Sequence, residues 1–124
     1  MLIQVLKSKL KEVIVTAAST EYEGSITLDP LLMKAAELHP YERVEVNAVN
    51  GKSRIVTYVI AGKRGSGCVE LNGGAANFFN KGDKVHVNCF AFFGNYDGYY
   101  KDWKDTPHIL PKIVITDENN KVID

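Results

Sequence analysis

Residues 55–60 are Ile55-Val56-Thr57-Tyr58-Val59-Ile60, an unbroken run of β-branched and aromatic side chains that begins directly after Arg54. Such side chains fit the pleated, half-buried surface of a sheet, so the run predicts a strand. Similar short runs occupy residues 13–16, 44–46, 85–87 and 113–115, and Gly-rich turns separate them. The sequence therefore predicts a mainly β fold, with a small barrel preferred to a sandwich.

One helix is predicted between Asp29, which can cap its first turn, and Pro40, which ends it. Pro30 suits its first position, and its apolar stripe consists of Leu31, Leu32, Ala35, Ala36 and Leu38. A second short helical turn is predicted at residues 75–79, after two glycines. The expected fold is thus a β-barrel with one or two short helices.

Length and charge limit the classes of function. The 124 residues suit a single domain, and 15 basic against 15 acidic residues leave no net charge. Nucleic acid and anionic membranes are therefore not expected partners. Cys68 and Cys89 lie in apolar runs, which indicates buried thiols in a reducing compartment. Without a leader-like or membrane-length apolar run, the protein is expected to be cytoplasmic.

Most familiar catalytic patterns are missing from the sequence. The three histidines have no cysteine or carboxylate at metal-ligand spacing, so no metal site is predicted, and neither a GxSxG elbow nor a phosphate loop occurs. The aromatic series from Phe90 to Trp103 is interleaved with lysines in the irregular segment 95–105. It suits either a stacking platform for single-stranded nucleic acid or a core or interface, and the zero net charge favours the second.

The motif Tyr22-Glu23-Gly24-Ser25 is, by itself, typical of a turn. Its neighbours give it another meaning, because the chain resembles the bacterial aspartate 1-decarboxylases from Lys9 to Asp83. The matching segments are Lys9, the motif itself, residues 54–58, Arg64-Gly65-Ser66 and Asn72-Gly73-Gly74-Ala75-Ala76. Lys11 and Asn47 depart from the family, which frequently has histidine and tryptophan there. The tail after Phe93 resembles no assigned segment.

This resemblance implies a double-psi β-barrel that assembles as a homotetramer. It also implies that the single domain, residues 1–124, cuts itself between Gly24 and Ser25 into residues 1–24 and 25–124. Ser25 would then become a covalent pyruvoyl group, which forms a Schiff base with the amine of L-aspartate. The implied reaction yields β-alanine and CO2 and supplies pantothenate and coenzyme A.

The chemistry explains why such residues are wanted. Loss of CO2 leaves a carbanion, so an electron sink must be conjugated with the substrate nitrogen. In the self-cleavage that the resemblance implies, the Ser25 hydroxyl attacks the Gly24 carbonyl. Gly24 permits a strained backbone there, and Thr57 is the implied donor to the developing oxyanion.

Substrate binding is assigned by the same resemblance and by side-chain chemistry. Arg54 can hold the substrate side-chain carboxylate through two parallel hydrogen bonds, Lys9 would act as a point charge, and Tyr58 would return a proton to the carbanion. The implied cradle for the α-carboxylate is formed by Asn72, Gly73, Gly74 and Ala75. In a regular strand Arg54 and Tyr58 share a face while Thr57 points the other way, which a bulge or a site between subunits would reconcile.

Two alternatives stay open. The chain could be a pyruvoyl decarboxylase of another small acidic amino acid, such as glutamate. It could also be a non-catalytic β-barrel binding module in which Gly24-Ser25 is only a turn and Arg54, Thr57 and Tyr58 are ordinary strand residues.

Overall fold

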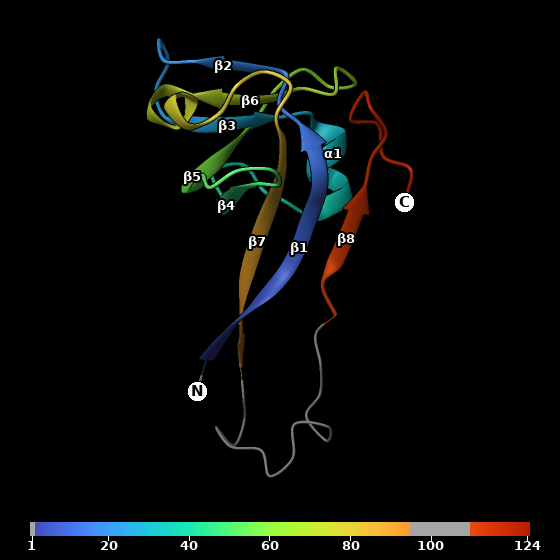
Figure 1. The fold of residues 1–124 in the computed structure, drawn as a ribbon. Coiled ribbons are helices and arrows are strands. Elements are labelled where there is room, and N and C mark those ends of the chain that lie inside the picture. Colours follow the sequence, from blue (N-terminus) through green and yellow to red (C-terminus); the bar gives the residue numbers. More distant parts are fainter. Residues whose placement is uncertain (1, 95–109) are drawn as a thin grey trace.

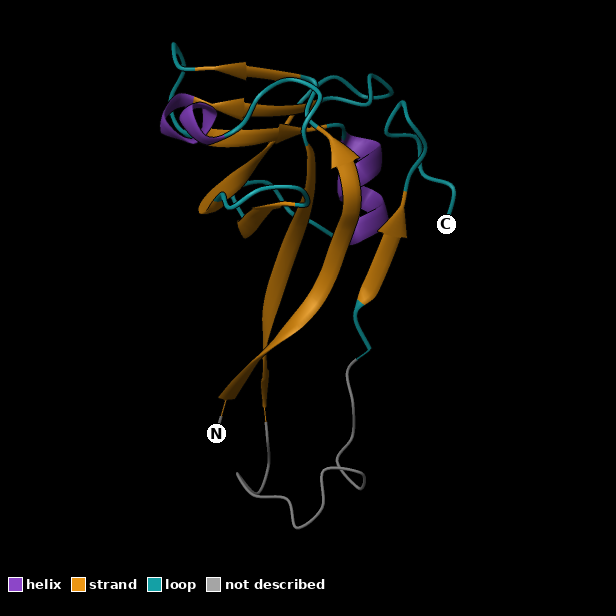
Figure 2. Cartoon of the chain, viewed as in Figure 1, coloured by secondary structure: helices purple, strands orange, loops and turns teal. Residues whose placement is uncertain are grey.

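The computed structural model describes residues 2–94 and 110–124. Within them lie eight strands and two short helices, shown in Figures 1 and 2. In chain order these are β1 (Leu2–Ile14), β2 (Ala17–Ser19), β3 (Ser25–Leu28), α1 (Pro30–Ala36), β4 (Arg43–Ala48), β5 (Arg54–Ala61), β6 (Val69–Asn72), η1 (Gly73–Phe78), β7 (Lys84–Gly94) and β8 (Lys112–Ile115). The mainly β prediction is confirmed, and neither of the described helices is long and apolar enough to span a membrane.

The described strands form one mixed sheet in the order β2-β6-β3-β5-β4-β7-β1-β8. Strand β5 joins its two parts: residues 54–58 pair antiparallel with β4, and residues 59–61 pair parallel with β3. In Figure 1, β2, β6 and β3 lie across the top while the long strands β1 and β7 run downward. Among the described strands no pairing between β2 and β8 closes the sheet, so the double-psi barrel stays a prediction.

The strand bounds differ from the predicted ones at the N-terminus. Residues 13–16 were expected to form one strand, but β1 extends from Leu2 to Ile14, and Val15 and Thr16 lie between β1 and β2. Strands β2, β3 and β6 lie outside the predicted runs. The second helical turn begins earlier than expected, at Gly73, and is a 3₁₀ helix.

Helix α1 ends earlier than predicted, at Ala36 rather than at Pro40, because Glu37 has a left-handed backbone, but its first turn forms as the sequence predicts. The Asp29 side chain caps it by accepting a hydrogen bond from the Leu31 N–H at 2.9 Å, and Pro30 is its first residue. Leu32, Met33 and Ala36 are its buried residues. They join a core made of alternate strand residues, in which the larger fully buried side chains are Leu10, Val13, Val15, Ile26, Leu28, Val44, Val46, Val59, Val69, Leu71 and Val85.

Both cysteines are buried free thiols, as expected. Cys89 lies 2.9 Å from the Glu42 carboxylate, which also binds the Lys7 ammonium at 2.7 Å. Burial, together with the hydrogen bond and charge of Glu42, raises the pKa of the Cys89 thiol to about 12. This thiol therefore stays protonated at neutral pH and packs as part of the core rather than serving as a nucleophile.

Candidate active site

The motif at residues 22–25 places Ser25 at the first position of β3, where it is only 1% exposed. Ser25 lies opposite Asn72 in the antiparallel pair of β3 and β6. The Asn72 side-chain amide donates to Ser25 Oγ at 2.9 Å and to Thr27 Oγ1 at 2.8 Å. A single amide thus fixes the position of the hydroxyl oxygen beside the Gly24–Ser25 peptide bond.

Two hollows flank this peptide bond. The first, of about 350 Å³, is called here the Ser25 hollow, and its lining residues are Tyr22, Glu23, Ser25, Thr27, Ile60, Glu70 and Asn72. The second, of about 400 Å³, is called the Gly24 hollow, and its lining residues are Gly24, Ile55, Val56, Thr57, Tyr58, Gly74, Ala75 and Phe78. One hollow thus reaches Ser25 and the other reaches Gly24, the two residues that the bond joins.

Close backbone packing behind the motif requires a glycine at position 73. Gly73 has a φ of 65°, and a Cβ atom there would lie 2.6 Å from both Gly24 N and Tyr22 O. At Gly24 an added Cβ would come no nearer than 3.9 Å to another residue, and its φ is outside the left-handed region. The close packing in this segment therefore falls on Gly73 rather than on Gly24.

Strand β5 brings two predicted residues to the Gly24 hollow. Its register with β4 runs without interruption from Arg54↔Asn47 to Tyr58↔Arg43, so Arg54 and Tyr58 share one face and Thr57 points to the other, as predicted. Thr57 and Tyr58 nevertheless line the same hollow, because β3 pairs only with residues 59–61 of β5. The edge of residues 54–58 that faces the motif is left open, and no bulge is needed.

Two predicted binding residues lie outside both hollows. Arg54 is exposed at the start of β5, opposite Asn47. Lys9 lies on β1, which is separated from β5 by β7 and β4, a distance of about 14 Å at the usual strand spacing. Within one chain the structure brings together Gly24, Ser25, Thr57, Tyr58, Asn72, Gly74 and Ala75, with Gly73 packed behind them.

Lys9 does share a sheet face with Arg54 and Tyr58. The pairings Lys9↔Asn88, Asn88↔Glu45 and Glu45↔Val56 place these four residues in one row across the sheet. Val56 lies between Arg54 and Tyr58 in the alternation of β5, so all of these side chains project from the face opposite the core. This outer face therefore carries three of the predicted catalytic and binding residues.

Lys11 and Asn47, the two positions expected to depart from the family pattern, both adjoin His86. Asn47 is the cross-strand neighbour of both Arg54 and His86. Burial and the charges of Lys9 and Lys11 lower the pKa of His86, and the Glu12 carboxylate only partly opposes this. Asn47 thus lies beside Arg54 on the outer face, and Lys11 adds positive charge near His86.

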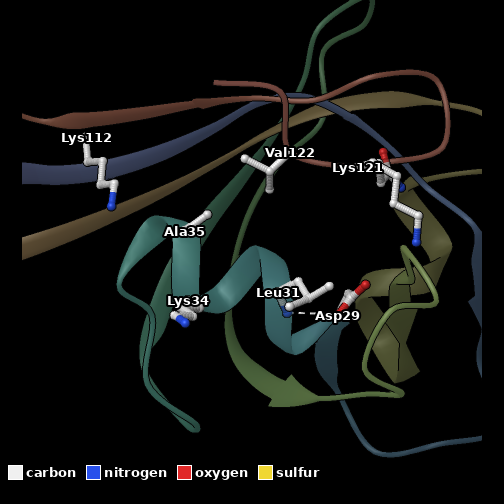
Figure 3. A pocket seen from close by; sticks show the side chains of 8 residues that line it. Asp29, Leu31, Lys34, Ala35, Lys112, Lys121 and Val122 are labelled. Carbon is white, nitrogen blue, oxygen red and sulfur yellow. Dashed lines mark hydrogen bonds between the residues drawn. The ribbon is translucent and has the colours of Figure 1, made fainter.

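A third hollow, larger than the Ser25 and Gly24 hollows, lies elsewhere in the described chain. Figure 3 shows it between α1 and the C-terminal segment, with a volume of about 490 Å³. Three of its lining residues are lysines, but Lys121 donates to the Gly65 carbonyl and Lys112 lies 3.9 Å from the Glu37 carboxylate. It contains none of the predicted site residues.

Sequence reasoning missed Thr27 and Glu70, which line the Ser25 hollow. Both are polar residues on strands that were not recognised, β3 and β6. The alternation in Val69-Glu70-Leu71-Asn72 would have indicated a strand with Glu70 and Asn72 on one face. It would not have shown that this face meets Ser25, because that depends on the pairing of β6 with β3.

Comparison with known proteins extends the resemblance over nearly the whole chain. A profile of the family described as aspartate decarboxylase matches residues 1–123. The aspartate 1-decarboxylase of Caldicellulosiruptor saccharolyticus is 44% identical over 123 residues, covering 99% of this chain and 90% of the relative. Those of Leptospira biflexa serovar Patoc and Syntrophus aciditrophicus are each 44% identical, over 98% and 94% of this chain and 97% and 94% of their own. The likeness thus extends beyond residues 9–83 and includes the tail.

Proposed function

The chain belongs to the aspartate decarboxylase family, and we propose that it performs the family's reaction at the Gly24–Ser25 site. That reaction converts aspartate to β-alanine with loss of CO2. The observation that best supports this site is the buried Ser25, whose hydroxyl accepts a hydrogen bond from Asn72. Its peptide bond joins two residues, Gly24 and Ser25, that each line a hollow. An ordinary surface turn has no such surroundings.

The first step of the proposal is self-cleavage. Ser25 Oγ attacks the Gly24 carbonyl carbon and converts the peptide into an ester. Elimination then releases the Gly24 carboxylate, and water hydrolyses the remaining enamine, which frees ammonia and leaves a pyruvoyl group at residue 25. Thr57 lines the hollow that contains Gly24, and its hydroxyl is the proposed donor to the carbonyl oxygen as negative charge develops there.

The surroundings of residue 25 fit such a group. A pyruvoyl carbonyl supplies the electron sink that decarboxylation of an amino acid requires. The Gly24 hollow, at about 400 Å³, has the size of a small-molecule site. Gly74 in its wall has no side chain and Ala75 has only a methyl group, so their backbone N–H groups are the proposed cradle for the α-carboxylate, with Gly73 packed behind.

Two side chains are proposed to act on the bound substrate. Tyr58 lines the Gly24 hollow and is the proposed proton donor to the carbanion. Arg54 is proposed to hold the side-chain carboxylate through its planar guanidinium group. Because Arg54 lies on the outer face, the substrate would extend around the open edge of β5 from the hollow toward this residue.

We propose that the active form is a homotetramer in which Lys9 of one copy completes the site of another. Lys9 lies three strands away from β5 within its own chain. The ends of β1 and β7 extend away from the rest of the sheet in Figure 1 and expose Leu2 and Phe92 at 69% and 71%. Exposed apolar residues of this kind mark contact surfaces, so these ends of β1 and β7 support the assembly of several copies.

Mass spectrometry of the intact protein tests the central claim. The purified chain should separate into residues 1–24 and 25–124, and hydroxylamine or borohydride should modify the larger piece and abolish β-alanine formation. A chain that stays whole yet releases CO2 from aspartate would overturn the pyruvoyl mechanism. Assembly is tested by mixing variants: Lys9→Ala and Arg54→Ala chains, each inactive alone, should regain activity when coexpressed if sites are shared between copies.

A further inference from the structure

Glu70 lies beside Ser25 on the sheet, and nothing in the decarboxylation uses it. Ser25 pairs with Asn72 and Thr27 pairs with Glu70, two rungs apart in the β3–β6 ladder, with the pair Ile26↔Leu71 between them. Residues two apart on a strand share a face, and all four side chains line the Ser25 hollow. The Cβ atoms of diagonal cross-strand neighbours lie about 7 Å apart, which a glutamate side chain spans directly or through one water molecule.

The Ser25 hydroxyl needs a proton acceptor that its known partner does not provide. Asn72 uses its side-chain N–H groups on Ser25 Oγ and Thr27 Oγ1 and is therefore a donor to both. Among the described residues, Ser25 Oγ donates no hydrogen bond. The hydroxyl must nevertheless lose its proton as the new bond to the Gly24 carbonyl carbon forms.

Two carboxylates line the Ser25 hollow, and their settings differ. Glu23 is exposed in the loop that precedes β3. Glu70 is half-buried on β6, which pairs with β2 on one side and β3 on the other, so its backbone is fixed relative to Ser25. A base that must meet a hydroxyl in one orientation is better placed on a paired strand than on an exposed loop.

We propose that the Glu70 carboxylate is the general base of self-cleavage, an inference that rests on the proposed function. Glu70 takes the proton from Ser25 Oγ as the oxygen bonds to the Gly24 carbonyl carbon. When the bond from that carbon to Ser25 N breaks, Glu70 passes the proton to the departing nitrogen. The products are an ester and a free amine, and Glu70 is again a carboxylate, so no further reactant is needed.

The test follows the rate at which intact chain disappears by mass spectrometry. Glu70→Gln, which keeps the side-chain shape, should slow cleavage about 100-fold, the usual contribution of a general base. Glu70→Asp should retain part of the rate. Glu70→Ala should be slow but should accelerate as formate is added, while chloride at equal ionic strength should have no effect. Glu23→Gln, a change to the other carboxylate in the hollow, is the matched control and should cleave normally.

Each other outcome overturns the inference in a recognisable way. Cleavage of Glu70→Gln at the wild-type rate removes Glu70 from the mechanism, and a slow Glu23→Gln beside a normal Glu70→Gln assigns the role to Glu23. A slow Glu70→Ala that formate does not accelerate, with a lower unfolding temperature, gives Glu70 a structural role. If the wild-type chain itself stays uncut, the proposed function has failed, whereas a cut wild type with normal Glu70→Gln cleavage refutes only this inference.

Discussion

The chain contains two Gly-Ser dipeptides, and their surroundings differ completely. Ser25 is 1% exposed at the start of a strand, whereas Ser66 is exposed in a turn. Ser25 Oγ accepts a hydrogen bond from Asn72, while Ser66 Oγ donates to the Lys63 carbonyl oxygen at 2.6 Å. The preceding glycines differ as well, because Gly65 has a φ of 83° and Gly24 lies outside the left-handed region.

The difference indicates that the reactivity of a serine depends on whether the fold uses its hydroxyl as a hydrogen-bond donor or only as an acceptor. The Ser66 hydroxyl donates its hydrogen bond to a backbone carbonyl. The turn is held by the Asp29 carboxylate, which accepts hydrogen bonds from the N–H groups of Gly65 and Gly67 at 3.0 and 2.8 Å. At Ser25 the hydroxyl oxygen accepts a hydrogen bond from Asn72, while the hydroxyl proton has no acceptor among the described residues. The same dipeptide therefore builds a turn at one place and a candidate reacting bond at the other.

Replacing each serine in turn tests most directly whether Ser25 and Ser66 have different roles. Ser25→Ala should abolish cleavage, because no attacking oxygen remains, and only the full-length mass should be seen after long incubation. Ser66→Ala should be cut like the wild type, since Ser66 serves a surface turn. Release of residues 1–24 from Ser25→Ala, or an uncut Ser66→Ala chain that is folded, would show that the two dipeptides have been assigned wrongly.

A second pair of variants asks whether the motif is held by the backbone behind it. Gly73→Ala would place a Cβ atom 2.6 Å from Gly24 N at a φ of 65°, so cleavage should slow at least about 10-fold and unfolding should need about 2 kcal/mol less. Gly74→Ala, which meets nothing within 4 Å, is the control and should change neither. Equal cleavage rates for the two variants, measured by intact mass, would mean that the packing of Gly73 does not position the bond.

The third prediction concerns stability on the Gly65-Ser66 side. Asp29→Ala removes the α1 cap and the acceptor of two backbone N–H groups, so the free energy of unfolding in urea should fall by about 3 kcal/mol. The folded fraction should still cleave, because Asp29 does not line either hollow beside Ser25. Asp83→Ala, which removes one exposed bond to Asn80 N, should cost less than about 1 kcal/mol.

The sequence predicted those parts of the fold whose residues carry a local signal. Strand β8 has a β-branched run, β5 has a run of β-branched and aromatic residues, and β4 has one valine on each side of Glu45. Helix α1 has both its Asp29 cap and its proline. Strands β2, β3 and β6 have only three or four residues each, and partner strands rather than local propensity stabilise them. Strand β1 was underestimated because lysines at positions 7, 9 and 11 interrupt its apolar pattern.

The site was predictable only where resemblance supplied the residues. It nominated Gly24, Ser25, Thr57, Tyr58 and Asn72, and the fold gathers these around one peptide bond. It could not place Lys9 or Arg54, since their distance from Ser25 depends on the strand order. Glu70 becomes visible only through the pairing of β6 with β3, a contact between residues far apart in the chain.

The last prediction concerns the pH dependence of stability, because an ionisable side chain, Asp29, holds the Gly65-Ser66 turn. Burial alone would raise the pKa of Asp29, but the N–H groups of Leu31, Gly67 and Gly65 and the charge of Lys121 lower it below its ordinary 3.8. A folded-state pKa below the unfolded one means that this stabilisation is complete above pH 3.8 and is lost as the pH falls through the lower folded value. The unfolding free energy of the wild type, measured in urea, should therefore decline in this acidic range. This loss should be smaller than the loss caused by Asp29→Ala, because a protonated carboxyl still accepts hydrogen bonds. The unfolding free energy of Asp29→Asn should decline less steeply with falling pH than that of the wild type. Parallel curves for the wild type and Asp29→Asn would show that Asp29 does not cause this acid sensitivity.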